Sequence, residues 1–310
     1  MRPMAVKAVL IAGPTASGKS ALALELAQAL DATVINADSM QVYREAPILT
    51  AQPNSAEKAK LPHPLYGHVS AREAYSVGRF AREAGEVLAR TKGIAIFVGG
   101  TGLYFSALTE GLADIPPIPA EIRAKTRALL EEIGVEALHR ELAARDPQTA
   151  SGLRPSDPQR VQRAYEVLEA TGRPLIEWQR EKTPPLLANL ETIKVVLDLP
   201  RPDLRLRIAE RLKRMLAQGA LEEARALADL DPALPAAKIL GLAEFVRLAE
   251  GSLSQEQALG RAAVATGQFA KRQSTWFRNR MADWKVFETA GPSLPADALH
   301  QIVDRIRQHR

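Results

Sequence analysis

The chain has 310 residues and contains no cysteine, only five histidines and 5% aromatic residues. Without a thiol it cannot form a disulfide, use a thiolate nucleophile or bind zinc through cysteine. None of the histidines stands at the spacing of an HExxH motif or another metal-ligand motif. The sequence therefore excludes cysteine-based chemistry and contains no recognisable zinc site.

Long hydrophobic runs are also missing. The apolar stretch 8–12 is followed at once by Gly13-Pro14, whereas a membrane-spanning helix needs about 18 apolar residues. A signal peptide needs a longer apolar region and a small-residue cleavage site, and the sequence has neither. With 46% apolar and 25% charged residues, the composition is that of a globular protein. We expect a cytoplasmic, monomeric protein with no membrane segment.

The positive charge is unevenly distributed. The formal net charge is +5, and residues 201–310 carry all of it, with 18 Lys and Arg against 13 Asp and Glu. Residues 1–200 hold 23 of each sign. Such asymmetry favours a polyanionic partner that is bound partly by the last third of the chain.

The apolar pattern predicts an α/β fold. Nearly continuous apolar runs of the kind found in parallel strands covered on both faces occur at 6–12, 33–37, 94–98 and 193–199. Helical periodicity follows the first run at 18–30 and precedes the third at 76–90. We therefore predict a P-loop-type parallel sheet core flanked by helices.

A helical insertion interrupts this core. From the proline-rich segment 115–119 to Pro184-Pro185, only helical periodicity occurs. Within it, Asp157-Pro158 predicts the start of a helix and Gly172 its end. We expect an all-helical subdomain at 118–189, inserted into a discontinuous core made of 1–117 and 190–310.

A phosphate-binding loop follows the first predicted strand. Its sequence matches GxxxxGK[ST] and comprises Gly13, Pro14, Thr15, Ala16, Ser17, Gly18, Lys19 and Ser20. The glycines allow backbone N–H groups to converge on phosphate oxygens at a helix N-terminus. Lys19 supplies a positive charge and Ser20 a hydroxyl for Mg²⁺.

The compound that carries the phosphate is less clear from the loop alone. A Walker-B aspartate should end a buried strand, but 94–98 runs into Gly99-Gly100-Thr101-Gly102, and Asp198 is the only other candidate. A diphosphate that leaves therefore fits as well as a γ-phosphate that is transferred. Whether ATP or another nucleotide occupies the loop stays open at this point.

Asp38 directly follows the predicted strand 33–37. Ligands of parallel sheets bind beyond the carboxyl ends of the strands, so Asp38 would share a rim with the P-loop if the two strands are neighbours. A carboxylate beside a bound phosphate either bonds to the ligands of a metal ion or acts as a general base. The alternative is that Asp38 caps the segment that follows it.

Five motifs resemble those of one family, the tRNA dimethylallyltransferases (tRNA isopentenyltransferases). They occur in order as GPTASGKS at 13–20, ADSMQVY at 37–43, VGGTGLY at 98–104, DPQRVQRAYEV at 157–167 and AKRQSTWFR at 270–278. The resemblance implies a P-loop core with an inserted helical domain. It also implies transfer of a dimethylallyl group from dimethylallyl diphosphate to N6 of adenosine 37 of tRNA, 3′ to the anticodon.

The resemblance further implies residue roles. Asp38 would accept the proton from the adenine amine, Arg211 would hold the diphosphate, Thr101 would fix the reactive geometry, and Ser20 would lie near Mg²⁺. The tRNA anticodon stem-loop would be contacted by Asp38, Ser39, Met40, Gln41, Thr101, Arg123, Gln159, Arg160, Val161, Gln162, Arg163, Lys238, Gly241, Lys271, Arg272, Gln273 and Arg278. The chain departs from residues usual in the family at Leu49, Gln52, Leu242, Ala243 and Gly267, none of which lies in the P-loop or at Asp38.

Other functions are compatible with parts of the sequence. Prenyl transfer onto free AMP or ADP would need neither the helical insertion nor the basic last third. A P-loop small-molecule kinase is disfavoured because no aspartate follows 94–98. An RNA-binding GTPase-like switch would need a base-recognition motif of the NKxD type, which the sequence lacks.

Overall fold

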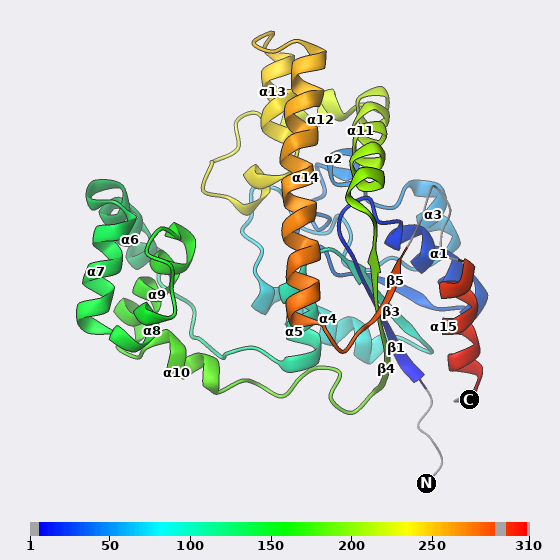
Figure 1. The fold of residues 1–310 in the computed structure, drawn as a ribbon, viewed down its shortest axis with the longest axis horizontal. Coiled ribbons are helices and arrows are strands. Elements are labelled where there is room, and N and C mark those ends of the chain that lie inside the picture. The colour runs from blue at the N-terminus through cyan, green and yellow to red at the C-terminus, as the bar shows by residue number, and fades with distance from the viewer. Residues whose placement is uncertain (1–5, 289–295, 309–310) are drawn as a thin grey trace. The chain divides into compact units, whose positions relative to one another are not determined.

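The computed structural model describes residues 6–288 and 296–308. The chain divides into two compact units, one formed by the described parts of Met1–Thr109 and Leu186–Arg310 and the other by Glu110–Pro185. Figure 1 shows the first unit as a sheet with helices on both faces, and the second as helices only.

The first unit contains a five-stranded parallel sheet in the order β2-β3-β1-β4-β5. The strands are β1 (Val6–Ala12), β2 (Thr33–Asn36), β3 (Ala95–Gly99), β4 (Glu191–Asp198) and β5 (Lys285–Glu288). The predicted α/β class is confirmed, and the four apolar runs match β1 to β4 within two residues. β5 was missed because, of its four residues, only Phe287 is buried, so the strand has no apolar run.

Alternating residues of β1 contribute to two different cores. Ala8, Leu10 and Ala12 point to one face of the sheet, and Val9 and Ile11 to the other. Because both faces are covered, β1 from Ala8 onward and all of β3 are buried, as is usual for central parallel strands. The carboxyl ends of these strands are therefore held rigidly.

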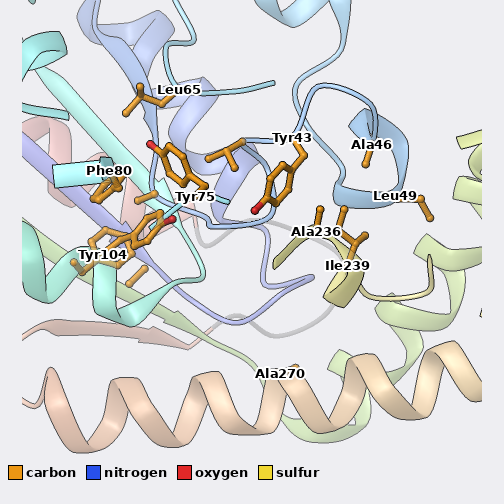
Figure 2. Packing of buried hydrophobic residues seen from close by; sticks show 14 of the residues in the cluster. Tyr43, Ala46, Leu49, Leu65, Tyr75, Phe80, Tyr104, Ala236, Ile239 and Ala270 are labelled. Atoms are coloured by element: carbon orange, nitrogen blue, oxygen red, sulfur yellow. The ribbon is translucent and has the colours of Figure 1, made fainter. Parts of the chain in front are cut away.

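Different helices cover the two faces. One face is covered by α1 (Lys19–Leu30) and α15 (Ala296–Gln308). The larger core on the other face (Figure 2) takes residues from α4 (Val77–Arg90), α5 (Gly102–Glu110), α11 (Arg201–Ala217), α12 (Ala220–Ala226), α13 (Leu242–Ala249) and α14 (Gln255–Arg280). The remaining short elements of this unit are α2 (Pro47–Thr50), α3 (Ser55–Lys60) and the 3₁₀ helix η1 (Pro235–Lys238).

Caps in the sequence explain where several of these helices begin. Ser76 accepts a hydrogen bond from the Arg79 N–H at the start of α4. Ser254 and Gln257 form a capping box at the start of α14, the longest helix with 26 residues. No helix in the described part of the chain combines the length and apolar character that crossing a membrane requires.

The second unit consists of α6 (Ala120–Ile133), α7 (Val135–Arg145), α8 (Pro147–Ser151), α9 (Pro158–Thr171) and α10 (Leu175–Arg180). Its bounds are 110–185, whereas the sequence suggested 118–189. The earlier start follows from pairing between its two connecting segments, where Thr183 N donates to Leu112 O at 2.7 Å and Lys182 Nζ lies 2.9 Å from Glu110 Oε2.

Helix α9 begins and ends where the sequence predicts. Asp157 Oδ1 accepts a hydrogen bond from Arg160 N at 3.1 Å, Pro158 is the first helical residue, and Gly172 closes the helix at φ 68°. Figure 1 shows α9 beside α6, α7 and α8, and the core of the unit includes Leu138 and Leu142 of α7.

Removal of this cap should loosen α9. Replacement of Asp157 by Ala leaves the Arg160 N–H without its acceptor and should cost about 1 kcal/mol, which corresponds to about fivefold faster amide exchange in α9. Hydrogen–deuterium exchange measures this. Asp157→Asn keeps the acceptor and should exchange like the wild type. If the Asn variant lost as much protection as the Ala variant, the exposed ion pair with Arg160 at 3.5 Å would be responsible instead of the cap.

Candidate functional site

The P-loop joins β1 to α1, as the sequence predicts. Gly18 adopts φ +91° immediately before α1, a conformation that favours glycine. Gly13 is constrained differently, because a Cβ there would lie 2.8 Å from both Leu197 O and Ser17 Oγ. The loop can therefore pack directly against β4 and present its backbone at the start of the helix.

Lys19 is buried within this loop. Its Nζ donates a hydrogen bond to Pro14 O at 3.1 Å. Burial lowers the pKa of Lys19 to about 8; the Asp38 carboxylate acts against this shift, whereas the Arg211 guanidinium adds to it. The Asp38 carboxylate thus offsets only part of the cost of burying the Lys19 ammonium group. An anionic ligand would stabilise this charge further.

Asp38 reaches the P-loop although its strand is not the neighbour of β1. The condition set by the sequence, that the two strands are neighbours, is not met, since β3 lies between β1 and β2. β3 ends at Gly99, and a Cβ on Gly99 would lie 2.0 Å from Ala37 O. Because no side chain fills that space, Asp38 and the P-loop line one cavity.

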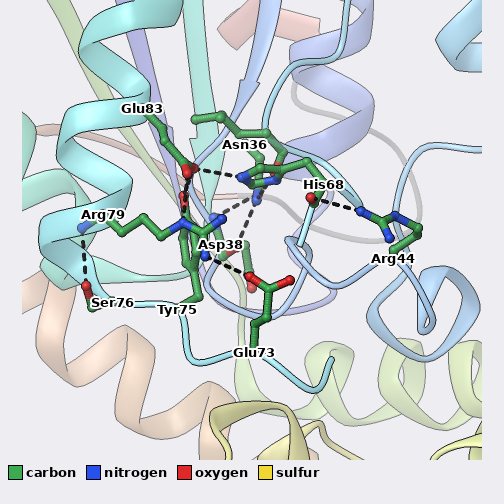
Figure 3. Close-up of polar contacts among 10 residues, drawn as sticks. Asn36, Asp38, Arg44, His68, Glu73, Tyr75, Ser76, Arg79 and Glu83 are labelled. Carbon is green, nitrogen blue, oxygen red and sulfur yellow. Dashed lines mark hydrogen bonds and ion pairs between the residues drawn. The ribbon is translucent and has the colours of Figure 1, made fainter. Parts of the chain in front are cut away.

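The residues around Asp38 are fixed by short-range hydrogen bonds. Asp38 Oδ1 accepts from Met40 N at 3.0 Å, and Oδ2 accepts from Gly100 N at 3.3 Å. The Asn36 side chain donates to Asp38 O and Leu65 O, both at 2.9 Å. The segment after Asp38 is a turn and not a helix, so the carboxylate does not act as a helix cap. Figure 3 shows Asn36 and Asp38 near a second polar network.

Glu83 is the centre of that network. Glu83 accepts hydrogen bonds from Tyr75 Oη at 2.6 Å and Arg79 Nε at 2.8 Å, and His68 Nε2 lies 2.8 Å from it. Burial raises the pKa of the Glu83 carboxyl, but the hydrogen bonds from these three partners lower it by a larger amount. The net shift of the pKa is therefore downward. The network stabilises the loop that carries His68.

Thr101 is bonded to the residue after Asp38. Ser39 N donates to Thr101 Oγ1 at 2.9 Å, and Thr101 N donates to Ala37 O at 3.4 Å. The 37–39 segment and the 99–101 segment therefore form one hydrogen-bonded piece. The structure thus brings Thr101, predicted from the sequence, to Asp38.

A cavity of about 750 Å³ lies between the P-loop, Asp38 and α11, within the size range of small-ligand sites. Its charged lining comprises Lys19, Asp38, Asp203, Arg207, Glu210, Arg211 and Arg214. Arg211, predicted from the sequence, faces this cavity, and burial lowers the pKa of its guanidinium while Asp38 opposes that shift. The cavity thus combines a phosphate loop, several cations and three carboxylates, of which Asp38 is the one that follows β2.

Arg207 and Arg214 were not recognised from the sequence. They stand four residues before and three residues after Arg211, and such spacing places all three on one face of a helix. Arg207 also lies 3.5 Å from the carbonyl oxygen of Ala16 in the P-loop. Helical spacing around a single assigned arginine was the signal that could have revealed them.

A smaller cavity of about 60 Å³ adjoins the first and shares Thr15, Asp38, Thr50 and Arg211 with it. The rest of its lining is mainly apolar and comprises Met40, Leu49, Ile208, Leu212, Met215, Ile239, Leu240 and Phe269. Thr266 also lines it, and its buried hydroxyl has no hydrogen-bond partner within the described part of the chain. These residues come from four separate segments, so no local motif marks them.

Helix α14 carries several predicted RNA-contacting residues. Lys271, Arg272 and Arg278 are exposed, and Arg278 lies 3.7 Å from Asp198. Gln273 is different, because only 6% of it is exposed and both of its amide atoms are bonded inside the protein. The expectation that Gln273 contacts RNA through its side chain is therefore corrected.

The helical unit carries a second set of residues that the sequence predicts to contact RNA. Arg123, Gln159 and Arg160 are exposed and Arg163 is half-buried. Val161 is 0% exposed in the core of this unit, so the expected RNA contact of its side chain is corrected as well. Gln162 Nε2 donates to Glu166 Oε1 at 2.8 Å.

The other predicted positions lie around the first cavity or on the connection before α13. Gln41 lines the large cavity and donates to Thr50 O and Ala51 O. Lys238 is exposed at the end of η1, and Gly241 precedes α13 at φ +84°. Among residues 6–288 and 296–308, no three His, Asp or Glu side chains gather as metal ligands would.

Comparison with known proteins relates nearly the whole chain to one group. The family model described as IPP transferase matches residues 41–280, and the one described as Isopentenyl transferase matches residues 6–62. A tRNA dimethylallyltransferase from a Bradyrhizobium species is 52% identical over 291 residues, covering 92% of this chain and 95% of the relative. One from Rhizobium meliloti is 49% identical over 289 residues, covering 91% and 95%.

Solved structures show the same similarity. A eukaryotic dimethylallyltransferase acting on tRNA matches with a TM-score of 0.82 and 28% identity, over 98% of this chain and 80% of that one. The tRNA isopentenylpyrophosphate transferase from Bacillus halodurans matches with a TM-score of 0.68 and 29% identity, over 98% and 97%. The similarity therefore extends over nearly the full length of both the sequence and the fold.

The buried lysine makes anion binding at this site dependent on pH. Because the pKa of Lys19 is lowered to about 8, the ammonium group loses its proton as the pH rises through that value. An organic diphosphate such as methyl diphosphate should therefore bind about eightfold more weakly at pH 9 than at pH 7.5, as calorimetric titration measures. Lys19→Arg stays charged at both pH values and should show equal affinities. The same weakening in both proteins would assign the effect to another group.

Proposed function

Because the chain belongs to the IPP transferase family, whose relatives are tRNA dimethylallyltransferases, we propose that it transfers a dimethylallyl group from dimethylallyl diphosphate to N6 of adenosine 37 of tRNA. The observation that carries this proposal is the single cavity lined by the P-loop, Asp38 and Arg211. Such a cavity holds a diphosphate and a base side by side, as the reaction requires.

The diphosphate would bind to the P-loop. The residues at the start of α1 line this end of the cavity, where their N–H groups can bind phosphate oxygens, and Lys19 and Arg211 add positive charge. Arg207 and Arg214 extend the cationic wall along α11. As the allylic C–O bond breaks, these groups stabilise the charge that develops on the leaving diphosphate. In such sites the loss of one donor typically costs about 3–4 kcal/mol.

Mg²⁺ suits this end of the cavity. The ion usually keeps several waters and binds one or two protein oxygens together with substrate phosphates, so it does not need a carboxylate cluster. Ser20 lines the cavity and is exposed, and its hydroxyl would be the protein ligand. When bound, Mg²⁺ would neutralise part of the diphosphate charge.

Asp38 would act as the general base. The exocyclic amine of adenine is a poor nucleophile because its lone pair is delocalised into the ring. Asp38 Oδ1 and Oδ2 each accept one backbone hydrogen bond, and a carboxylate offers about four lone-pair positions, which leaves capacity for the adenine amine. A positioned base of this kind contributes about 10²–10⁴ in rate.

The smaller cavity would receive the five-carbon group. Its lining is mainly apolar, and Thr15, Asp38 and Arg211 line both cavities. A prenyl chain in the smaller cavity would therefore extend from a diphosphate on the P-loop. Apolar walls also exclude water, which would otherwise compete with adenine for the allylic carbon.

Exposed basic side chains would bind the RNA. They occur on α14 at Lys271, Arg272 and Arg278, and in the helical unit at Arg123 and Arg160. Contacts of this type neutralise phosphates and position the nucleic acid. The target base must then leave the anticodon-loop stack to reach a cavity.

The direct test of the function is product formation. Purified protein with Mg²⁺, dimethylallyl diphosphate and unmodified tRNA carrying adenosine 37 should add one dimethylallyl group to that nucleoside, as mass spectrometry of digested tRNA detects. AMP and ADP serve as alternative acceptors in parallel reactions. Transfer to AMP without transfer to tRNA would contradict the proposal, and so would ATP-dependent phosphorylation of a small substrate in place of prenyl transfer.

The role of Asp38 has its own test. Asp38→Asn preserves the size of the side chain and removes the base, so single-turnover transfer should fall by about 10²–10⁴. The Kd for tRNA, measured by filter binding, should stay within about twofold of the wild type. A comparable loss in both measurements would make Asp38 a binding residue instead of the base.

A further inference from the structure

Gln273 lies on the inner side of α14, whose neighbouring residues Lys271 and Arg272 are exposed. Its side chain uses both ends of the amide at once. The Oε1 atom accepts a hydrogen bond from Thr15 N at 2.9 Å, and the Nε2 group donates one to Gly100 O at 2.7 Å. One buried side chain thus connects the P-loop to the loop after β3.

The second partner, Gly100, belongs to the piece that carries Asp38. Gly100 N donates to Asp38 Oδ2 at 3.3 Å, and the adjacent Thr101 is bonded to Ser39 and Ala37. Any displacement of Gly100 is therefore passed to the carboxylate. The position of Asp38 depends on what holds Gly100.

The side chains of Gln273 and Asp38 occupy the space into which a side chain at position 100 would project. A Cβ at this position would lie 2.2 Å from Gln273 Nε2 and 3.2 Å from Asp38 Oδ2. The Gly100 carbonyl accepts from Gln273 and the Gly100 N–H donates to Asp38, so a side chain at this position would collide with Gln273. The chain from Thr15 through Gln273 and Gly100 to Asp38 consists of contacts between neighbouring atoms.

We propose that Gln273 is a positioning residue that sets the separation between the P-loop and the Asp38 carboxylate. This inference rests on the proposed function, in which the P-loop holds the electrophile and Asp38 activates the nucleophile. A misplacement of about 1 Å between reacting groups can cost about 10²-fold in rate. Gln273 has this effect without touching either substrate.

The chemistry of the amide explains why glutamine suits this position. A neutral amide offers an acceptor oxygen and a donor nitrogen, and the two partners are one N–H and one C=O. A glutamate accepts from Thr15 N but has no proton for Gly100 O when ionised. A methionine of similar length replaces neither bond, which leaves the buried Gly100 carbonyl unpaired at a cost of about 1–3 kcal/mol.

The test uses Gln273→Met, Gln273→Glu and the matched control Gln255→Met. Gln255 is exposed in the first turn of the same helix, so its replacement reports the general effect of a glutamine-to-methionine change on α14. For each protein we measure the single-turnover rate of prenyl transfer with both substrates saturating, the Kd for tRNA and the melting temperature.

For Gln273→Met we expect a rate about ten- to a hundredfold lower and a Kd for tRNA within about twofold of the wild type. Gln273→Glu should fall between this variant and the wild type, because it keeps the bond from Thr15. Gln255→Met should match the wild type in all three measurements.

Three results would overturn the inference. An unchanged rate in Gln273→Met would show that the bridge has no effect on the reaction. A raised Kd with an unchanged saturated rate would make Gln273 an RNA contact. A lower melting temperature with a normal rate per tRNA-binding molecule would leave only a stabilising role. A wild-type protein that modifies no tRNA would instead overturn the proposed function, which separates the two failures.

Discussion

The site depends on the close backbone approach at the end of β3. A side chain at Gly99 would collide with Ala37 O, and one at Gly100 would collide with Gln273 and approach Asp38. Because both positions are glycine, Ala37 N can bond to Val98 O at 2.8 Å. The residues after Ala37 can then cross the end of β3 close to its backbone. Asp38 therefore lines the same cavity as Lys19 and Arg211, although β1 and β2 are separated by a strand. The electrostatics of that cavity follow from this one steric constraint.

The sequence predicted those parts of the fold that depend on local pattern. Continuous apolar runs identified β1 to β4, and Asp157, Pro158 and Gly172 marked both ends of α9. The order of the strands was beyond such reasoning, because which strands pair is decided by the packing of distant segments. β5 was missed for a local reason, since an edge strand with one buried residue has no hydrophobic run.

The same distinction holds for the site. The P-loop and Asp38 lie in contiguous motifs, and their residue types alone indicate phosphate binding and proton transfer. Gln273 also lies in a motif, but its amide is bonded to residues 258 and 173 positions away in the chain. Whether such a side chain faces RNA or the interior depends on the placement of α14 against the sheet. Val161 was misassigned because it lies in the same motif as Arg160 and Arg163, whereas its side chain is buried in the core of the helical unit.

The charges in the cavity link proton transfer to departure of the diphosphate. Burial lowers the pKa of Lys19 and of Arg211, and in both cases Asp38 is the group that opposes the shift. In the proposed reaction Asp38 becomes neutral when it takes the amine proton, so the two cations lose that stabilisation. At the same time the breaking C–O bond leaves one more negative charge on the diphosphate at the P-loop. This new charge replaces the one lost at Asp38, so the cavity keeps its balance of charge only when both steps proceed together. A site in which buried charges interact strongly thus favours a reaction in which base and leaving group act in concert.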